Sequence, residues 1–366
     1  MKALLVVRPN AFVVHGGDVV HAQRAATALR ALGVVADLVA TDTPDPRGYD
    51  VAHVFGVFEP DTARRQIAAV RAHRVPLVLS PIWLDLRELF ALAPRVERAL
   101  AARDAASAER RFTRLTREAS RLPWRGRVAR HADRRLAAQR GLVLAADVLL
   151  PASDVEARLY AGVLQAERVP VVVAPLGVDD DRFVVDPPAA RAGVLCAGRI
   201  ESKKNQAALL YALRGIDVDV TIVGASHDAR YLALCKRWAT PRTRFLQHVE
   251  HDALRSLMAG AAVHAHPSWL ETPGLASLEA AAAGARVVTG NRGCEREYFG
   301  PEADYADPAD PQSIRAAVLR ALARGPREPD DALSRRLRGF TWRRHAEATR
   351  DAYERARAAH GATVQP

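Results

Sequence analysis

The chain has 366 residues, enough for two domains of ordinary size, with 49% apolar and 26% charged residues, as in soluble globular proteins. No apolar run reaches the roughly 18 residues of a membrane span, and the opening run, 3–7, is too short for a signal-peptide core. Three widely spaced cysteines disfavour a disulfide framework and a metal site. We therefore expect a cytoplasmic protein.

Short apolar strands alternate with helical patterns through the first half. The expected strands are 3–7, 34–39, 51–55, 77–80 and 148–150. This alternation predicts parallel βαβ units, which bind ligands beyond the carboxyl ends of their strands. At the first such end, Gly16 and Gly17 let the backbone approach a ligand closely, although a plain tight turn explains them equally well. Ser153 and Glu156 have capping-box spacing at the start of a helix.

The net charge of +11 is concentrated in one segment. Residues 95–140 contain fourteen arginines and five acidic residues, a net charge of +9. Such a segment can face an anionic membrane, with Phe112, Leu115 and Leu122 as a narrow apolar stripe and Trp124 at the interface. We do not expect nucleic acid as a partner. The alternative is a solvated helical face in a protein that prefers arginine to lysine.

Basic residues follow the first strand of the second half. This strand ends at Gly198, and Arg199, Lys203 and Lys204 come directly after it. The whole chain has four lysines, so two adjacent ones here indicate a positional requirement for compact ammonium groups. We expect Lys203 to point away from Lys204. The alternative is a solvated basic loop.

A strand–loop–helix unit over 261–284 carries two carboxylates. Glu271 lies in the loop, and Glu279 lies at the edge of the helix's buried stripe, where an ionised group needs hydrogen-bonding partners. Free amides at the helix start, near Gly274 and Leu275, suit a phosphate. Carboxylates for sugar hydroxyls beside a phosphate site suggest a nucleotide-sugar site.

The sequence His266-Pro267-Ser268, followed by Glu271 and then Glu279, resembles the E-x7-E signature of retaining GT-B glycosyltransferases of family four. The resemblance implies that the first Glu contacts the donor sugar and the second the nucleotide ribose. It also implies that Arg199 and Lys204, at the positions of the family's Gly-Arg…Lys motif, neutralise the donor diphosphate.

Other segments extend the resemblance along the chain. Gly16-Gly17 is similar to a family loop that borders the acceptor and the donor phosphates, and 290–299 is similar to a loop that closes over the donor, with Glu297 at its acidic position. Residues 175–179 resemble an interdomain signature in which Leu176 replaces the usual Asn. A proline pair at 187–188 then marks a linker.

The resemblance implies an α/β protein of GT-B architecture, with two Rossmann-like domains facing across a cleft and a C-terminal helix crossing back to the first domain. We expect an acceptor-side domain over 1–168 that includes the Arg-rich helical segment 95–140. A nucleotide-sugar domain over 169–340 and a crossover helix and tail over 341–366 follow. The implied activity is that of a retaining glycosyltransferase, hexosyltransferase-type, acting on a glycan or glycolipid in surface polysaccharide biosynthesis.

We predict Glu271, Arg199 and Lys204 as catalytic residues, and no metal or other cofactor, because preorganised cations can stabilise a leaving diphosphate. The predicted substrate-binding residues are Glu279, Gly274, Leu275, Thr272, Gly16, Gly17 and Glu297. Two alternatives stay open: a nucleotide-sugar epimerase on a similar fold, and a non-catalytic polyanion-binding protein. Peripheral contact with the inner membrane face through 95–140 is a further expectation.

Overall fold

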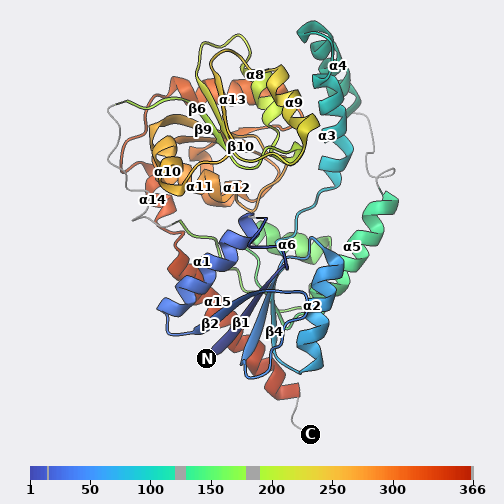
Figure 1. Cartoon of the computed structure of the whole chain (residues 1–366). Coiled ribbons are helices and arrows are strands. Elements are labelled where there is room, and N and C mark those ends of the chain that lie inside the picture. The colour runs from blue at the N-terminus through green and yellow to red at the C-terminus, as the bar shows by residue number, and fades with distance from the viewer. Residues whose placement is uncertain (15, 120–128, 179–189, 364–366) are drawn as a thin grey trace. The chain divides into compact units, whose positions relative to one another are not determined.

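The chain folds into two α/β units (Figure 1). The computed structural model describes residues 1–14, 16–119, 129–178 and 190–363. Unit 1 comprises Met1–Leu84, Arg130–Gly177 and Phe340–Pro366, and unit 2 comprises Asp85–Ala129 and Val178–Gly339. The linker predicted at 187–188, together with Leu122 and Trp124, lies outside the described residues. No helix within the described ranges is both long and apolar enough to cross a bilayer.

Unit 1 is built on a parallel sheet with the strand order β2-β1-β3-β4-β5. Successive side chains of β1 point to opposite faces: Leu5 and Val7 pack with α1 and α15, whereas Leu4 and Val6 pack with α2 and α6. Helices therefore cover both faces, which explains why the strands are nearly continuous apolar runs. The elements of unit 1 are β1 Lys2–Val7, α1 Gly17–Ala31, β2 Val35–Ala40, β3 Val51–Phe55, α2 Pro60–Ala72, β4 Leu77–Ser80, α5 Ala129–Leu144, β5 Val148–Leu149, α6 Asp154–Gly162 and α15 Trp342–Thr363.

The C-terminal helix α15 packs on unit 1, although unit 2 precedes it in the sequence. Ala346, Ala352 and Tyr353 lie in the core around α1 and β1. The Tyr353 hydroxyl is 2.9 Å from Nδ1 of the buried His53 on β3. The predicted return of the last helix to the first domain is confirmed.

Unit 2 contains a second parallel sheet, with the strand order β11-β10-β9-β6-β7-β8. Strands β6 and β9 are hydrogen-bonded neighbours, with Val194 opposite Val263. The segments that follow these two strands therefore leave the same edge of the sheet side by side. The elements of unit 2 are α3 Arg87–Leu100, α4 Ala105–Ala119, β6 Ala192–Ala197, the 3-10 helix η2 Ser202–Lys204, α8 Gln206–Leu213, β7 Val220–Val223, α9 Ala229–Arg237, β8 Thr243–Leu246, α10 His251–Gly260, β9 Ala261–His266, α11 Leu275–Ala282, β10 Arg286–Gly290, α12 Glu295–Phe299, the 3-10 helix η3 Gly300–Glu302, β11 Asp304–Ala306, α13 Pro311–Ala323 and α14 Ala332–Leu337.

The Arg-rich segment 95–140 does not form part of the first domain as a whole, contrary to the prediction. Its helices α3 and α4 belong to unit 2, where they lie beside α8 and α9, and α5 belongs to unit 1 (Figure 1). Phe112 and Leu115 are buried against unit 2, and the Phe112 ring lies 5.4 Å from the ring of Tyr211. The apolar stripe of α4 therefore stabilises unit 2, by about 1.5–3 kcal/mol for each buried side chain, and is unavailable to a membrane.

Candidate functional site

An ion pair between Lys204 and Glu271 lies at the carboxyl edge of β6 and β9. The Lys204 Nζ is 2.6 Å from Oε1 of Glu271, and the side chains are 14% and 8% exposed. Lys204 ends η2, just after β6, whereas Glu271 lies in the loop between β9 and α11. The parallel pairing of β6 with β9 brings these distant residues together.

The carboxylate of Glu271 is held in its ionised form. Burial by itself raises the pKa of Glu271, but the positive charges of Lys204 and Lys203 outweigh it and leave this pKa well below its usual range. The Ser268 hydroxyl lies 2.5 Å from the same Oε1 and 3.0 Å from the carbonyl oxygen of Lys203. The positive charge of Lys203 thus acts on Glu271 together with that of Lys204, although we expected Lys203 to point away.

Arg199 lies five residues before Lys204, at the start of the same loop. Its side chain is 43% exposed, and it forms a loose ion pair with Glu201, at 3.4 Å. Because a guanidinium has five N–H donors, one weak partner leaves most of them available to an anion. The loop after β6 thus presents three cations, Arg199, Lys203 and Lys204, at the edge where Glu271 lies.

Helix α11 begins beside Glu271. Gly274 has φ +85°, a conformation that L side chains rarely adopt, and a Cβ there would be in ordinary contact with the Glu271 side chain, 3.4 Å from Cγ. The amides of Ser277 and Leu278 donate to the Gly274 carbonyl, at 2.9 and 3.2 Å. The earlier amides, from Leu275, have no acceptor within the helix and are suited to an anion.

The remaining predicted site residues of unit 2 lie on the same loop or on neighbouring helices. Thr272 follows Glu271 and is half-buried. Glu279 lies one turn after Leu275 on α11, and Glu297 lies on α12; both are half-buried and interact with other residues of the chain. Their contacts with a donor stay predictions.

Gly16 and Gly17 belong to unit 1, where Gly17 is the first residue of α1. Arg8, which follows β1, forms an ion pair with Asp18 in the first turn of α1, at 2.8 Å. The predicted contact of Gly16 and Gly17 with acceptor and donor phosphates stays a prediction.

Buried polar atoms without a hydrogen-bond partner gather at the carboxyl edge of the unit 2 sheet. Within the described part of the chain they include the ring nitrogens of His266, the hydroxyls of Ser277 and Thr289, and both carboxyl oxygens of Glu295. An unpaired buried polar atom costs about 1–3 kcal/mol, so this group indicates a place where a ligand or ordered water supplies partners. Sequence reasoning missed these residues, although a histidine that ends a buried strand is a detectable signal.

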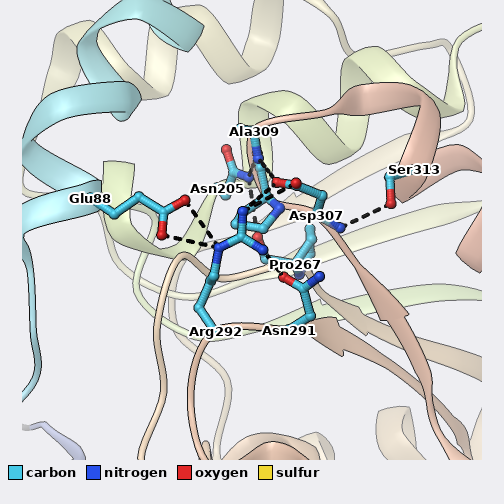
Figure 2. Close-up of polar contacts among 9 residues, drawn as sticks. Glu88, Asn205, Pro267, Asn291, Arg292, Asp307, Ala309 and Ser313 are labelled. Atoms are coloured by element: carbon cyan, nitrogen blue, oxygen red, sulfur yellow. Dashed lines mark hydrogen bonds and ion pairs between the residues drawn. The ribbon is translucent and has the colours of Figure 1, made fainter. Parts of the chain in front are cut away.

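Figure 2 shows a polar network that ties together the loops of this edge. Asn205, which follows Lys204, is buried and donates through Nδ2 to the carbonyl oxygens of Pro267 and Pro308, at 3.1 and 2.8 Å. Pro267 lies four residues before Glu271. The amide of Asn205 thus connects the two loops that carry the Lys204–Glu271 pair.

Arg292, in the loop after β10, connects that loop to helix α3 (Figure 2). Its guanidinium lies 3.0 and 3.1 Å from the carboxylate oxygens of Glu88 on α3, and 3.1 Å from both carboxylate oxygens of Asp307. Asp307 in turn accepts from the backbone amide of Ala309, at 2.9 Å. The loop after β10 is therefore held by charges on both sides.

Comparisons with known proteins show similarity to glycosyltransferases. Residues 178–338 match the model of the family "Glycosyl transferases group 1". Glycogen synthase of Mycobacterium tuberculosis is 31% identical over 198 residues, which cover 50% of this chain and 48% of that protein. The chain spans about half the length of the curated relatives it matches.

Solved structures resemble the chain over nearly its whole length. Sucrose-phosphate synthase from Thermosynechococcus elongatus has a TM-score of 0.63 and 18% identity, and covers 99% of this chain and 98% of its own. The Anabaena protein HepE in complex with UDP-glucose has a TM-score of 0.63 and 15% identity, with 100% and 99% covered. Residues 178–338 are thus similar to the glycosyl transferases group 1 family, and the chain has the GT-B fold of these structures.

Proposed function

We propose that the chain is a retaining glycosyltransferase that moves a sugar from a nucleotide-diphosphate sugar to a glycan or glycolipid acceptor. The observation that carries the proposal is the buried ion pair of Lys204 with Glu271, with Arg199 on the same loop. The UDP-glucose complex of HepE, which shares the fold, supports a nucleotide-sugar donor. Surface polysaccharide biosynthesis is the setting that we propose.

The chemistry of this reaction places demands that these residues meet. As the bond between the anomeric carbon and the diphosphate oxygen breaks, negative charge builds on the departing diphosphate. Arg199 and Lys204, with amides at the start of α11, can stabilise that charge, and one such preorganised donor is typically worth about 3 kcal/mol. We propose that they do so without a metal or other cofactor.

The two carboxylates have separate roles in this proposal. Glu271, which is ionised and fixed by Lys204 and Ser268, accepts hydrogen bonds from the donor sugar. Glu279 on α11 accepts from the ribose of the nucleotide. Because a carboxylate has about four acceptor positions, Glu271 can hold Lys204 and a sugar hydroxyl at the same time.

The test combines binding with transfer. UDP-, GDP- and ADP-sugars are screened by thermal shift, and we expect one nucleotide to raise the unfolding midpoint by mass action. Sugar transfer to a glycan or glycolipid acceptor should then fall about 100-fold or more in Glu271→Gln, and not in the exposed control Glu250→Gln. Donor turnover without an acceptor would favour an epimerase, and binding without transfer to any acceptor would favour a non-catalytic protein.

We also propose contact with an anionic membrane, made by exposed arginines alone and without insertion of apolar side chains. Arg110, Arg111 and Arg114 of α4 are exposed, whereas the apolar face of α4 is buried. Binding to anionic vesicles should therefore weaken steeply as salt is raised, because charges farther apart than about 8 Å are screened at physiological ionic strength. Salt-insensitive binding in a flotation assay would contradict this form of contact.

A further inference from the structure

Glu295, the first residue of α12, carries a buried carboxyl group that the proposed reaction does not use. The residue is 1% exposed, and neither of its oxygens has a hydrogen-bond partner among the described residues. An ionised carboxylate in such surroundings costs several kcal/mol, so binding a proton is the cheaper state. Burial, and then the negative charge of Glu271, raise the pKa of Glu295 to about 8.

The carboxyl group of Glu295 is packed against the loop that holds Glu271. A Cβ added to Gly293 would lie 2.5 Å from Oε2 of Glu295 and 2.3 Å from the carbonyl oxygen of Glu271, so both oxygens pack closely against Gly293 and leave no room for a side chain there. The Cys294 Sγ lies 3.8 Å from the same carbonyl oxygen. Residues 293–294 therefore lie in contact with both the Glu295 carboxyl group and the backbone of Glu271.

Within the described part of the chain, no cation is hydrogen-bonded to the Glu295 carboxyl group, and the guanidinium of Arg296 lies over the Tyr305 ring instead, 3.9 Å from its centre. Glu271 follows β9 and is negative, Thr289 on β10 provides a hydroxyl, and the phenol of Tyr305 on β11 is neutral at ordinary pH. On α14, the guanidinium of Arg336 pairs with Glu302, at 3.3 Å. An ionised Glu295 would thus add a second negative charge beside Glu271 with no cation of its own.

We propose that Glu295 is a positioning residue, which in its uncharged form holds the loop that keeps Glu271 paired with Lys204. Ionisation of Glu295 repels the Glu271 carboxylate and so disturbs its pairing with Lys204. Transfer activity is then lost as the solution becomes alkaline. The expected effect on turnover rests on the proposed function, whereas the uncharged state of Glu295 is independent of it.

The first experiment compares pH profiles of transfer for the wild type, Glu295→Gln and Glu295→Ala. The wild type should lose activity about tenfold per pH unit above pH 8. Glu295→Gln, which keeps the shape of the uncharged acid, should stay within about twofold of the wild type at pH 7 and lack the alkaline loss. Glu295→Ala should lose activity at every pH, and Glu250→Gln should follow the wild-type profile. An identical alkaline loss in the wild type and Glu295→Gln would overturn the proposal.

The second experiment needs no transfer activity. A carboxyl group whose folded pKa is raised binds its proton more tightly in the folded state, so its contribution to stability is lost as pH rises from about 4.3 to about 8. The unfolding midpoint of the wild type should fall relative to that of Glu295→Gln across this range, and the difference should stop growing above pH 8. Parallel curves would show that Glu295 is not held uncharged, whether or not the chain transfers sugars.

Discussion

Replacing Lys204 with Met removes the ammonium group from the ion pair with Glu271 and keeps most of the side-chain volume. At the 2.6 Å separation of Nζ and Oε1, the attraction is about 6 kcal/mol for an effective dielectric constant of about 20. Part of this is offset, because the variant no longer buries an ammonium group. Breaking a buried pair costs about 3–5 kcal/mol, and the slight exposure of both side chains favours the lower end, about 3 kcal/mol.

The pH dependence of the contribution that Glu271 makes to stability should change sign in Lys204→Met. In the wild type the pKa of Glu271 is depressed, so its contribution to stability is present above about 4.3 and is lost as pH falls below that value. Without Lys204, burial becomes the dominant influence on the pKa of Glu271. The variant should therefore be least destabilised in mildly acidic solution, where Glu271 can take up a proton.

The assay is a double-mutant cycle in urea with Lys204→Met, Glu271→Gln and the double variant. The double variant removes both members of the ion pair, so we expect it to recover at least about 2 kcal/mol relative to the sum of the single changes. It should remain inactive in transfer. Arg242→Met is the matched control, because Arg242 is 46% exposed and pairs at 2.8 Å with the exposed Asp219, which is worth less than about 1 kcal/mol. Additive effects, or a Lys204→Met loss no larger than that of Arg242→Met, would refute the reasoning.

Three further predictions concern other parts of the chain. Burial lowers the pKa of His345 to about 4, so this residue alone should cost the wild type about 3 kcal/mol between pH 6.5 and 4, because the unfolded state takes up the proton first; urea titrations should show a shallower loss in His345→Gln. Asn205→Ala removes the donor from two buried carbonyl groups and should lower the free energy of unfolding in urea by about 2–3 kcal/mol. Asn205→Gly should be no worse, because glycine adopts the φ of +63° without strain. Equal stability of Asn205→Ala and the wild type would contradict the bridging role. Arg199→Ala should change the free energy of unfolding by no more than about 0.5 kcal/mol, because the side chain is 43% exposed. It should lower turnover about 100-fold, and retained turnover in a transfer assay would remove Arg199 from the mechanism.

Features that depend on neighbours in the sequence were predictable. The expected strands 51–55 and 77–80 coincide with β3 and β4, because buried parallel strands are short continuous apolar runs. The Ser153 cap is confirmed: its Oγ accepts from the amide of Glu156, at 3.0 Å, and the Glu156 carboxylate accepts from the amide of Ala152, at 2.7 Å. The parallel βα alternation also placed Lys204 and Glu271 at one edge of the sheet, where the structure has them in contact.

Contacts between segments far apart in the chain were not predictable. The apolar stripe of α4 has the same pattern whether it covers a membrane or a protein core, and only the tertiary structure shows that Phe112 packs on unit 2. The charge pattern likewise gave no sign that Arg292 pairs with Glu88 across 204 positions.

The sequence by itself therefore determined the fold class, the strands of the first sheet and the segments that carry the candidate site, because these follow from local periodicity and motif spacing. Only the tertiary structure decided which charges are buried and which are paired. Glu271 and Glu295 are both glutamates in loop-and-helix segments, yet one is ionised beside Lys204 and the other is buried without a countercharge. The physical reason is that the free energy of a charge depends on its solvent and its neighbours, which long-range packing sets.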